Sequence, residues 1–350
     1  MTTLAARARA GFILVRNGSP SQRIAMYASL PRWLRRQLHE REEARQEGIA
    51  STTTKEKKKT SRDPRINDIG RAIEDDFAAI RETYATPKNP IVLAHGLMGF
   101  NELRLVGNLL PGVQYWRGIT EAMRANGVKV IIASVPASGS IEERALKLGQ
   151  DIAAKADGKS VNIIAHSMGG LDARYMISQL QPDNVEVLSL TTVATPHRGS
   201  AFADYCFETI GPRRLPYLYK LVEATGLGTG AFKQLTRRYM AEEFNPKTPD
   251  DATVRYFSYG AVAKPGWFSA FRQPHKVMNK MEGPNDGLVS VASSRWGTYK
   301  GTLVNCSHLD LINWTNRLRS FTWKITGHKS HFNAVAFYLD ITDMLAKEGL

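Results

Sequence analysis

The chain has 350 residues, with 47 Lys and Arg against 33 Asp and Glu, and its formal net charge is +14. A hydrophobic fraction of 43% excludes wholesale disorder, and the lack of an apolar run of about 18 residues argues against a spanning helix. Two cysteines are too few for a disulfide scaffold or a four-cysteine zinc site. The basic excess leaves nucleic acid, a membrane surface and an import machinery as partner classes.

The first 39 residues carry seven Arg and contain no Lys, Asp or Glu. An Arg-rich, acid-free segment filled with Ala, Ser and Leu is typical of a mitochondrial transit peptide. A secretory signal fits less well, because the apolar stretch Gly11–Val15 is short and Arg16 interrupts it. A disordered basic tail is the alternative. Residues 1–39 are therefore predicted to be a transit peptide, with a mitochondrial location and the import machinery as partner.

Residues 40–65 read as a charged linker, rich in Thr, Lys and Arg towards their end. The run Lys55–Lys59 resembles a nucleic-acid patch, but it has no neighbouring aromatic residues, so no nucleic-acid partner is expected. Residues 1–65 hold 15 basic and 6 acidic side chains, which leaves residues 66–350 with a net charge of only +5. Most of the basic excess thus precedes the predicted folded domain, residues 66–350.

Helical and strand patterns alternate along this domain. Apolar periodicity and turn residues predict, in chain order, a helix over Ile66–Tyr84, a strand over Pro90–His95, a helix over Trp116–Ala125, a strand over Lys129–Val135, a helix over Ile141–Ala156, a strand over Val161–Ala165, a helix over Gly169–Leu180, strands over Val185–Ala194, Val254–Tyr259 and Leu303–Cys306, and a helix over Phe332–Leu345. This order predicts an α/β fold with a mostly parallel central sheet and helices on both faces. Ligands of such sheets bind at the carboxyl ends of the strands.

The segment Val161–Gly170 reads as a strand, a tight turn with one serine, and a helix. It matches the nucleophile elbow Gly-x-Ser-x-Gly with Ala165 in place of the first glycine. Small residues two before and two after the serine are needed because strand and helix approach closely there. We predict Ser167 as a nucleophile; the alternative is an ordinary turn with a capping serine.

A serine nucleophile needs a base, and in this fold the chain order is Ser, then Asp or Glu, then His. His308 follows the last predicted strand and is the favoured base over His275, His328 and His331, the other histidines that remain after Ser167 and a candidate acid. The favoured acid is Asp286, in the turn Asn-Asp-Gly, where it can orient the imidazole. Less favoured candidate acids are Asp310, which follows His308, and Asp204.

Acyl transfer also needs two backbone donors for the oxyanion. The residue after the nucleophile, Met168, is predicted to supply one N–H. The glycine-containing loop His95–Phe100, after the first core strand, is predicted to supply the other through Leu97. The alternative reading of this loop is a simple tight turn.

These segments together resemble the true-lipase branch of the α/β-hydrolases, which includes secreted bacterial lipases and fungal mitochondrial triacylglycerol lipases. The matching segments span about Pro90 to Asn313 in family order: Leu93–Gly99, Tyr115–Ile119, Val161–Arg174, Thr192–Ala203, Asn285–Ser294 and His308–Asn313. The resemblance implies an α/β-hydrolase fold with a helical lid insertion. It also implies Ser167, Asp286 and His308 as catalytic residues, with Leu97 and Met168 as oxyanion donors.

The sequence departs from the bacterial relatives in two positions that matter for a disulfide and a metal. Ala292 stands where those relatives often have a disulfide cysteine, and neither Cys206 nor Cys306 replaces it in position. Asp310 matches a calcium-ligand position, but Trp314 stands where another oxygen ligand is expected. One carboxylate is too few for a calcium site. No metal and no cofactor are therefore expected.

The implied activity is that of a triacylglycerol lipase, a serine hydrolase that cleaves neutral glycerides through an acyl-enzyme at a membrane or droplet surface. A phospholipase or a short-chain carboxylesterase is the nearest alternative, because the same residues would serve each. A non-catalytic lipid-binding protein is a remote alternative. The apolar, glycine-interrupted segment of about residues 202–244 is expected to form the lid, with a fixed cap helix as the alternative.

Overall fold

The computed structural model describes residues 68–74, 76–97, 115–137, 139–206, 229–265, 269, 271–314 and 332–350. All of them belong to one compact unit, Pro64–Leu350. The predicted transit peptide, the predicted linker and residues 207–228 of the predicted lid lie outside the described residues. These three predictions therefore stay predictions.

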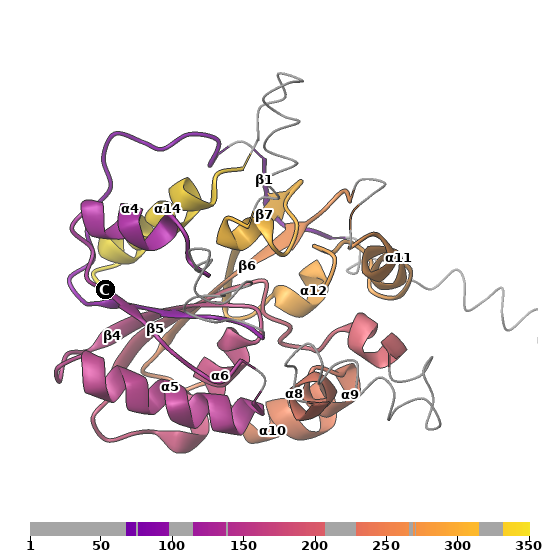
Figure 1. Ribbon diagram of the computed structural model, residues 1–350, viewed down its shortest axis with the longest axis horizontal. Coiled ribbons are helices and arrows are strands. Elements are labelled where there is room, and N and C mark those ends of the chain that lie inside the picture. Colours follow the sequence, from indigo (N-terminus) through magenta and orange to yellow (C-terminus); the bar gives the residue numbers. More distant parts are fainter. Residues whose placement is uncertain are drawn as a thin grey trace, which may run out of the picture. The chain divides into compact units, whose positions relative to one another are not determined.

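A seven-stranded sheet forms the centre of the described domain (Figure 1). Its order is β1-β7-β6-β5-β4-β2-β3, and each neighbouring pair is parallel. The strands are β1 (Ala72–Ile73), β2 (Ile91–Ala94), β3 (Val130–Ile132), β4 (Val161–His166), β5 (Val187–Val193), β6 (Arg255–Val262) and β7 (Thr298–Val304). The predicted α/β fold with a mostly parallel sheet is confirmed.

Helices cover both faces of this sheet, with α4 and α14 on one face and α5 and α6 on the other (Figure 1). The described helices are α4 (Ile119–Ala125), α5 (Ile141–Lys155), α6 (Gly169–Tyr175), η2 (Met176–Leu180), α8 (Thr229–Gln234), α9 (Arg237–Tyr239), η3 (Met240–Phe244), α10 (Asn245–Lys247), α11 (Arg272–Met281), α12 (Val291–Ser294), η4 (Asp310–Ile312) and α14 (Ala334–Lys347). In the described part of the chain, no helix is long and apolar enough to cross a bilayer.

Alternation along the strands divides the apolar side chains into two cores. In β2, Leu93 packs into the core that includes Phe337 of α14, whereas Val92 packs into the core that includes Leu148 and Ile152 of α5. Successive strand residues point to opposite faces, so a fully apolar strand contributes to both layers. Each such side chain stabilises the fold by about 1.5–3 kcal/mol on burial. Packing on both faces thereby fixes the central strands, and with them the start of the loops at their carboxyl ends.

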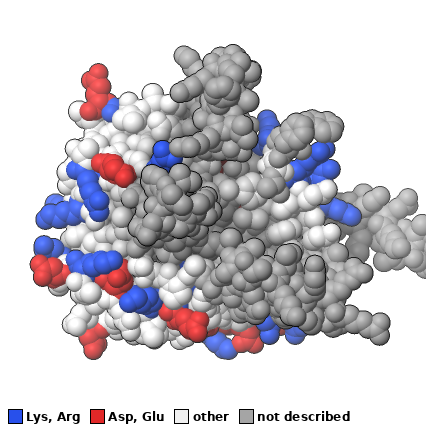
Figure 2. All heavy atoms as spheres, in the orientation of Figure 1, with Lys and Arg blue, Asp and Glu red and all other residues white. Residues whose placement is uncertain are grey.

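Helix α5 begins with a capping box, formed by Ser140 and by Glu143 three residues later. The Ser140 hydroxyl accepts a hydrogen bond from the Glu143 N–H, and the Glu143 carboxylate accepts one from the Ser140 N–H. These two bonds satisfy donors that a helix N-terminus otherwise leaves unpaired. Around this helix, acidic and basic side chains are interspersed at the surface (Figure 2).

The prediction of a helix over Ile66–Tyr84 is wrong for the residues that the structure describes in this range. Gly70 adopts a left-handed φ of 63°, and its N–H donates to the Asp68 carboxylate in a local turn. The chain then forms β1, whose Ile73 pairs beside Leu303 of β7. The buried side chains Ile73 and Phe77 reflect this strand and the turn after it rather than a helical face. Sheet pairing at the edge strand outweighed the helical spacing.

The remaining predicted elements are present, with boundaries that shift by a few residues. The predicted helix Gly169–Leu180 consists of α6 followed directly by the π-helical turn η2. Strand β7 begins at Thr298, before the predicted start at Leu303. Helices α11 and α12 were not predicted, because the first is strongly polar and the second has only one turn.

Candidate active site

Ser167 lies in a tight turn between β4 and α6, at the carboxyl edge of the sheet. Its φ of 55° is left-handed, a conformation that a residue with a side chain rarely adopts. The turn is held by the Ser167 N–H, which donates to the Val193 carbonyl (3.0 Å), and by the Thr195 hydroxyl, which donates to the Ser167 carbonyl (2.7 Å). The strained turn raises the serine side chain above the strand ends.

The small residues of this turn are required by close packing. A Cβ at Gly169 would lie 2.7 Å from the Ala94 carbonyl oxygen, and a Cβ at Gly170 would lie 2.2 Å from the Thr195 hydroxyl. Real Cβ atoms do not approach other atoms so closely. The helix after Ser167 can therefore sit against β2 and the loop after β5 only because both positions are glycine.

The structure brings Ser167, His308 and Asp286 into one hydrogen-bonded chain. The Ser167 Oγ lies 2.9 Å from Nε2 of His308, and Nδ1 of His308 lies 2.7 Å from Oδ2 of Asp286. These are the contacts that a nucleophile, a general base and an orienting carboxylate need. His308 is 5% exposed and Asp286 is fully buried, so water competes little for either contact.

Asp286 is fixed in place by backbone donors. Its Oδ1 accepts from the N–H groups of Leu288 (2.9 Å) and Val289 (2.8 Å), which leaves Oδ2 for the imidazole. The backbone carbonyl of Asp286 also accepts from the His308 N–H (3.0 Å). The loop that carries the carboxylate and the loop that carries the imidazole are thus joined through both backbone and side chain.

The predicted oxyanion donors flank Ser167. The backbone of Gly96 packs against the nucleophile, since a Cβ at Gly96 would lie only 2.7 Å from the Ser167 Cβ. Leu97 follows directly, and Met168 begins the turn into α6. Among the described residues, neither the Leu97 N–H nor the Met168 N–H donates to a protein acceptor. In the described part of the chain, no protein acceptor therefore competes for these two groups with an oxygen atom bound beside Ser167.

A buried ion pair that was not predicted from the sequence supports the loop after β2, which contains His95 and Gly96. Arg144 of α5 and Asp172 of α6 lie 2.7 Å apart, at 0% and 1% side-chain exposure. Burial raises the pKa of Asp172 to about 6, although Arg144 opposes that shift. The guanidinium also donates to the carbonyls of His95 (2.8 Å) and Pro136. An Asp in the apolar start of the helix after Ser167 was the one sequence signal that could have indicated it.

The less favoured candidates for the acid and for the base make other contacts or lie outside the described residues. The Asp310 carboxylate accepts from the N–H (3.0 Å) and the hydroxyl (2.7 Å) of Ser307. Asp204 pairs with Arg237. His275 lies on α11, where burial lowers its pKa and its carbonyl accepts from Asn285. His328 and His331 lie outside the described residues.

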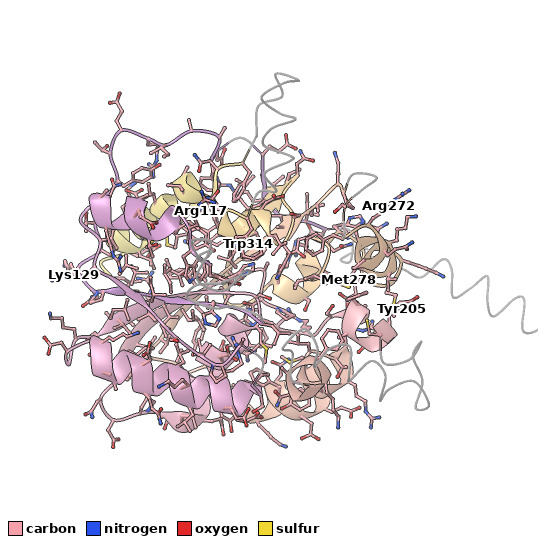
Figure 3. All side chains as sticks on the ribbon, in the orientation of Figure 1. Arg117, Lys129, Tyr205, Arg272, Met278 and Trp314 are labelled. Atoms are coloured by element: carbon pink, nitrogen blue, oxygen red, sulfur yellow. The ribbon has the colours of Figure 1, made fainter. Side chains whose placement is uncertain are left out.

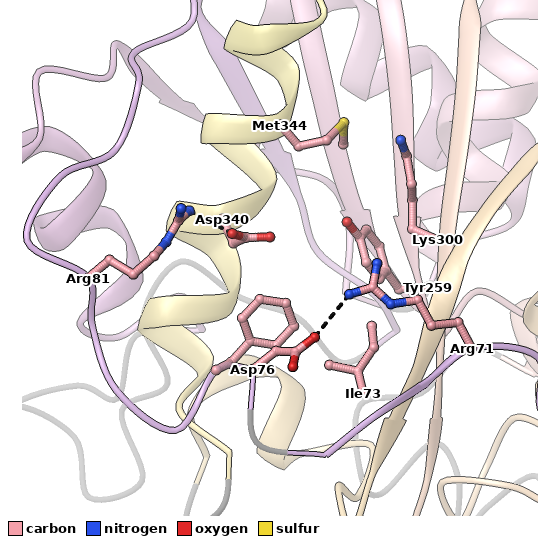
Figure 4. A pocket seen from close by; sticks show the side chains of 9 residues that line it. Arg71, Ile73, Asp76, Arg81, Tyr259, Lys300, Asp340 and Met344 are labelled. Carbon is pink, nitrogen blue, oxygen red and sulfur yellow. Dashed lines mark hydrogen bonds and ion pairs between the residues drawn. The ribbon is translucent and has the colours of Figure 1, made fainter.

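A cavity of about 310 Å³ lies away from the triad, between β1, β6, β7 and α14 (Figure 4). Ion pairs border it: Arg71 with Asp76 (3.0 Å), and Arg81 with Asp340 (2.6 Å). Because these cations already have carboxylate partners, we assign no ligand to this cavity. Across the described ranges, no group of three or more His, Cys, Asp or Glu is arranged to hold a metal ion, and Cys206 is a free thiol.

The parallel sheet, the strained serine turn and the Ser–His–Asp chain define a serine hydrolase. A family model described as "Putative serine esterase (DUF676)" matches residues 141–243. Triacylglycerol lipase 2 of Saccharomyces cerevisiae is 38% identical over 322 residues, covering 78% of this chain and 96% of that protein. A triacylglycerol lipase of Vibrio cholerae is 29% identical and covers 73% and 90%.

Solved structures agree on the fold. A Staphylococcus hyicus lipase superimposes with a TM-score of 0.56 at 21% identity, covering 77% of this chain and 98% of that one. A metagenomic carboxyl esterase gives a TM-score of 0.59 at 21% identity, with coverage of 77% and 79%. The chain belongs to the lipase family of α/β-hydrolases, and it is a carboxylic ester hydrolase.

Proposed function

We propose that this protein is a triacylglycerol lipase that acts through an acyl-enzyme on Ser167. The observation that carries the proposal is the hydrogen-bonded chain from Ser167 through His308 to Asp286. The relatives in yeast and Vibrio cholerae, both named triacylglycerol lipases, support neutral glycerides as the substrate. The lipid ester would be met at a membrane or droplet surface.

The proposed reaction begins when Nε2 of His308 takes the Ser167 proton while Oγ attacks the ester carbonyl. The carbonyl oxygen becomes an oxyanion, which the N–H groups of Leu97 and Met168 stabilise. Asp286 holds the imidazole in the tautomer with the proton on Nδ1 and stabilises the imidazolium. His308 then protonates the leaving alcohol. Water, deprotonated by the same imidazole, attacks the acyl carbonyl, and His308 returns that proton to the Ser167 Oγ as the fatty acid leaves.

The substrate class is tested with one panel of esters. Full-length protein and its Ser167→Ala variant are compared on a triacylglycerol emulsion, phospholipid vesicles and a dissolved short-chain ester. We expect the highest rate on the emulsion and about 10⁶-fold lower activity in the variant. A preference for phospholipid or for dissolved ester would assign one of the alternative activities. Full activity of Ser167→Ala would overturn the assignment of the nucleophile.

We further propose that residues 1–39 direct the protein to mitochondria. The support is compositional: seven Arg with no Lys, Asp or Glu. A fluorescent reporter fused to residues 1–39 should co-localise with mitochondria, and the same fusion with all seven Arg changed to Gln should not. Diffuse fluorescence of the unchanged fusion would contradict the proposal.

A further inference from the structure

The Tyr115 hydroxyl connects two parts of the active site that are distant in sequence. Tyr115 is 7% exposed, and its Oη accepts a hydrogen bond from the Gly96 N–H at 3.1 Å. The same oxygen lies 2.7 Å from Nδ1 of His166, the residue immediately before the nucleophile. One buried hydroxyl thus joins the loop after β2 to the end of β4.

The position of Gly96 determines where the next N–H points. A Cβ on Gly96 would lie 2.7 Å from the Ser167 Cβ and 3.2 Å from its Oγ, so the loop backbone touches the nucleophile. The following residue is Leu97. Because peptide groups are rigid planes, a displacement of Gly96 re-aims the Leu97 N–H. In the described part of the chain, the Gly96 N–H has the Tyr115 hydroxyl as its acceptor.

His166 is suited to hold the Tyr115 hydroxyl without disturbing the base. Burial lowers the pKa of His166 well below its ordinary value, and the neighbouring His308 lowers it further. The ring is therefore neutral at pH 7, and Nδ1 can accept the Tyr115 proton. The ring centroids of His166 and His308 are 4.5 Å apart. A neutral His166 places no competing positive charge beside the imidazolium that forms at His308.

The surroundings of Tyr115 restrict its movement. Its ring makes an edge contact with Trp116 (centroids 5.0 Å apart), and Trp116 makes another with Tyr338 of α14 (5.4 Å). Two residues further on, the Arg117 carbonyl accepts from the Asn313 side chain (2.9 Å), and Figure 3 shows Arg117 near Trp314 of the loop after His308. The segment that carries Tyr115 is thus joined to the loop that follows the base, His308.

We infer that Tyr115, itself held by His166, is a positioning residue that sets the Gly96–Leu97 backbone against Ser167 for oxyanion binding. The inference rests on the proposed function, since it assumes that the Leu97 N–H receives the oxyanion. Tyr115 does not touch the reacting atoms in this account. Loss of the Tyr115 hydroxyl should reduce the stabilisation of the transition state and leave ground-state binding of the ester intact.

The first test compares Tyr115→Phe with Tyr338→Phe. Tyr338 is also fully buried in this aromatic group, but its hydroxyl has no hydrogen-bond partner among the described residues. We expect Tyr115→Phe to lower kcat by about 10- to 100-fold with KM within about twofold of wild type. Tyr338→Phe should keep wild-type kcat. Equal kcat values for the two variants, or a rise in KM alone, would overturn the inference.

The second test keeps the inference falsifiable if Tyr115→Phe does not fold. In His166→Asn the side-chain amide oxygen can still accept a hydrogen bond from the Tyr115 hydroxyl. In His166→Leu the side chain offers no acceptor. We expect Asn to retain most of kcat and Leu to lose about as much as Tyr115→Phe. Equal loss in both would overturn the role of His166. Ser167→Ala separates the two levels: if it is inactive while Tyr115→Phe is normal, the proposed function stands and this inference fails.

Discussion

Ser167 and His308 are 141 residues apart in sequence, yet Oγ and Nε2 lie 2.9 Å from each other. Two loops at the carboxyl edge of one parallel sheet make this contact, the first after β4 and the second after β7. Asp286 extends the chain from the loop that follows α11. In the proposed mechanism, this contact lets the imidazole take the proton of the serine hydroxyl.

Replacing the carboxylate should disable the base while leaving the fold intact. In Asp286→Asn the side-chain oxygen can still accept from the Leu288 and Val289 N–H groups, so the loop is retained. The amide then faces Nδ1 of His308 and favours the wrong tautomer, and we expect kcat to fall by about 10⁴-fold. Steady-state kinetics on a dissolved ester would measure it. The matched change Asp310→Asn should cost less than about threefold, and the reverse ranking would reassign the acid.

The glycine after the elbow should not tolerate a methyl group. Gly169→Ala would place Cβ 2.7 and 2.8 Å from two backbone carbonyl oxygens of the β2 end, and we expect a loss of about 1–3 kcal/mol in the free energy of unfolding together with lower activity. Gly149→Ala is the control. Its Cβ would meet side-chain atoms only, Cγ of Pro182 at 3.3 Å and the flexible Met176 at 3.5 Å, and helix propensity favours alanine. Urea denaturation showing equal effects would refute the packing argument.

The buried pair Arg144–Asp172 should be costly to break and inexpensive to replace. Arg144→Met leaves the Asp172 carboxylate buried without its cation, so we expect a loss of about 3–5 kcal/mol in unfolding free energy. Arg144→Met with Asp172→Leu removes both charges and should recover much of that stability. Activity should not recover, because the guanidinium bond to the His95 carbonyl is lost in both variants. A double variant less stable than the single one would contradict this.

Acid should destabilise the fold through buried neutral histidines. Burial lowers the pKa of His95 to about 4, whereas the unfolded ring titrates near 6.5. Below pH 6.5 the unfolded state therefore binds more protons than the folded state. The contribution of neutral His95 to the free energy of unfolding is present above that pH and is lost as the pH falls towards 4. Between pH 8 and pH 5 the loss is about 2 kcal/mol.

The variant His95→Gln tests this sign directly, because it removes the titrating ring. Unfolding free energies from urea titrations at pH 8 and pH 5 should differ less in the variant than in wild type, by about 2 kcal/mol. His166 and His197, whose pKa values burial also lowers, should keep part of the acid sensitivity. An unchanged difference between the two pH values would show that His95 is not buried in its neutral form.

Local sequence patterns were sufficient to predict the sheet and the elbow. The short, fully buried runs of β2 and β4, and the small residues around Ser167, can be recognised in the sequence because they reflect steric requirements of neighbouring residues. The Ile66–Tyr84 segment was misread because its pairing partner, β7, lies more than 200 residues away. The contacts of Tyr115 with Gly96 and His166 could not be predicted, since they depend on side-chain positions set by three separate segments.

The measurement that tests the account most directly is covalent labelling of the full-length protein with a fluorophosphonate, read by intact mass and peptide mass spectrometry. The account predicts one adduct per chain, located on Ser167, and none on the Ser167→Ala variant. Asp286→Asn should be labelled far more slowly, because its imidazole cannot activate the hydroxyl. An adduct on another residue, or equal labelling of Ser167→Ala, would contradict the central claim.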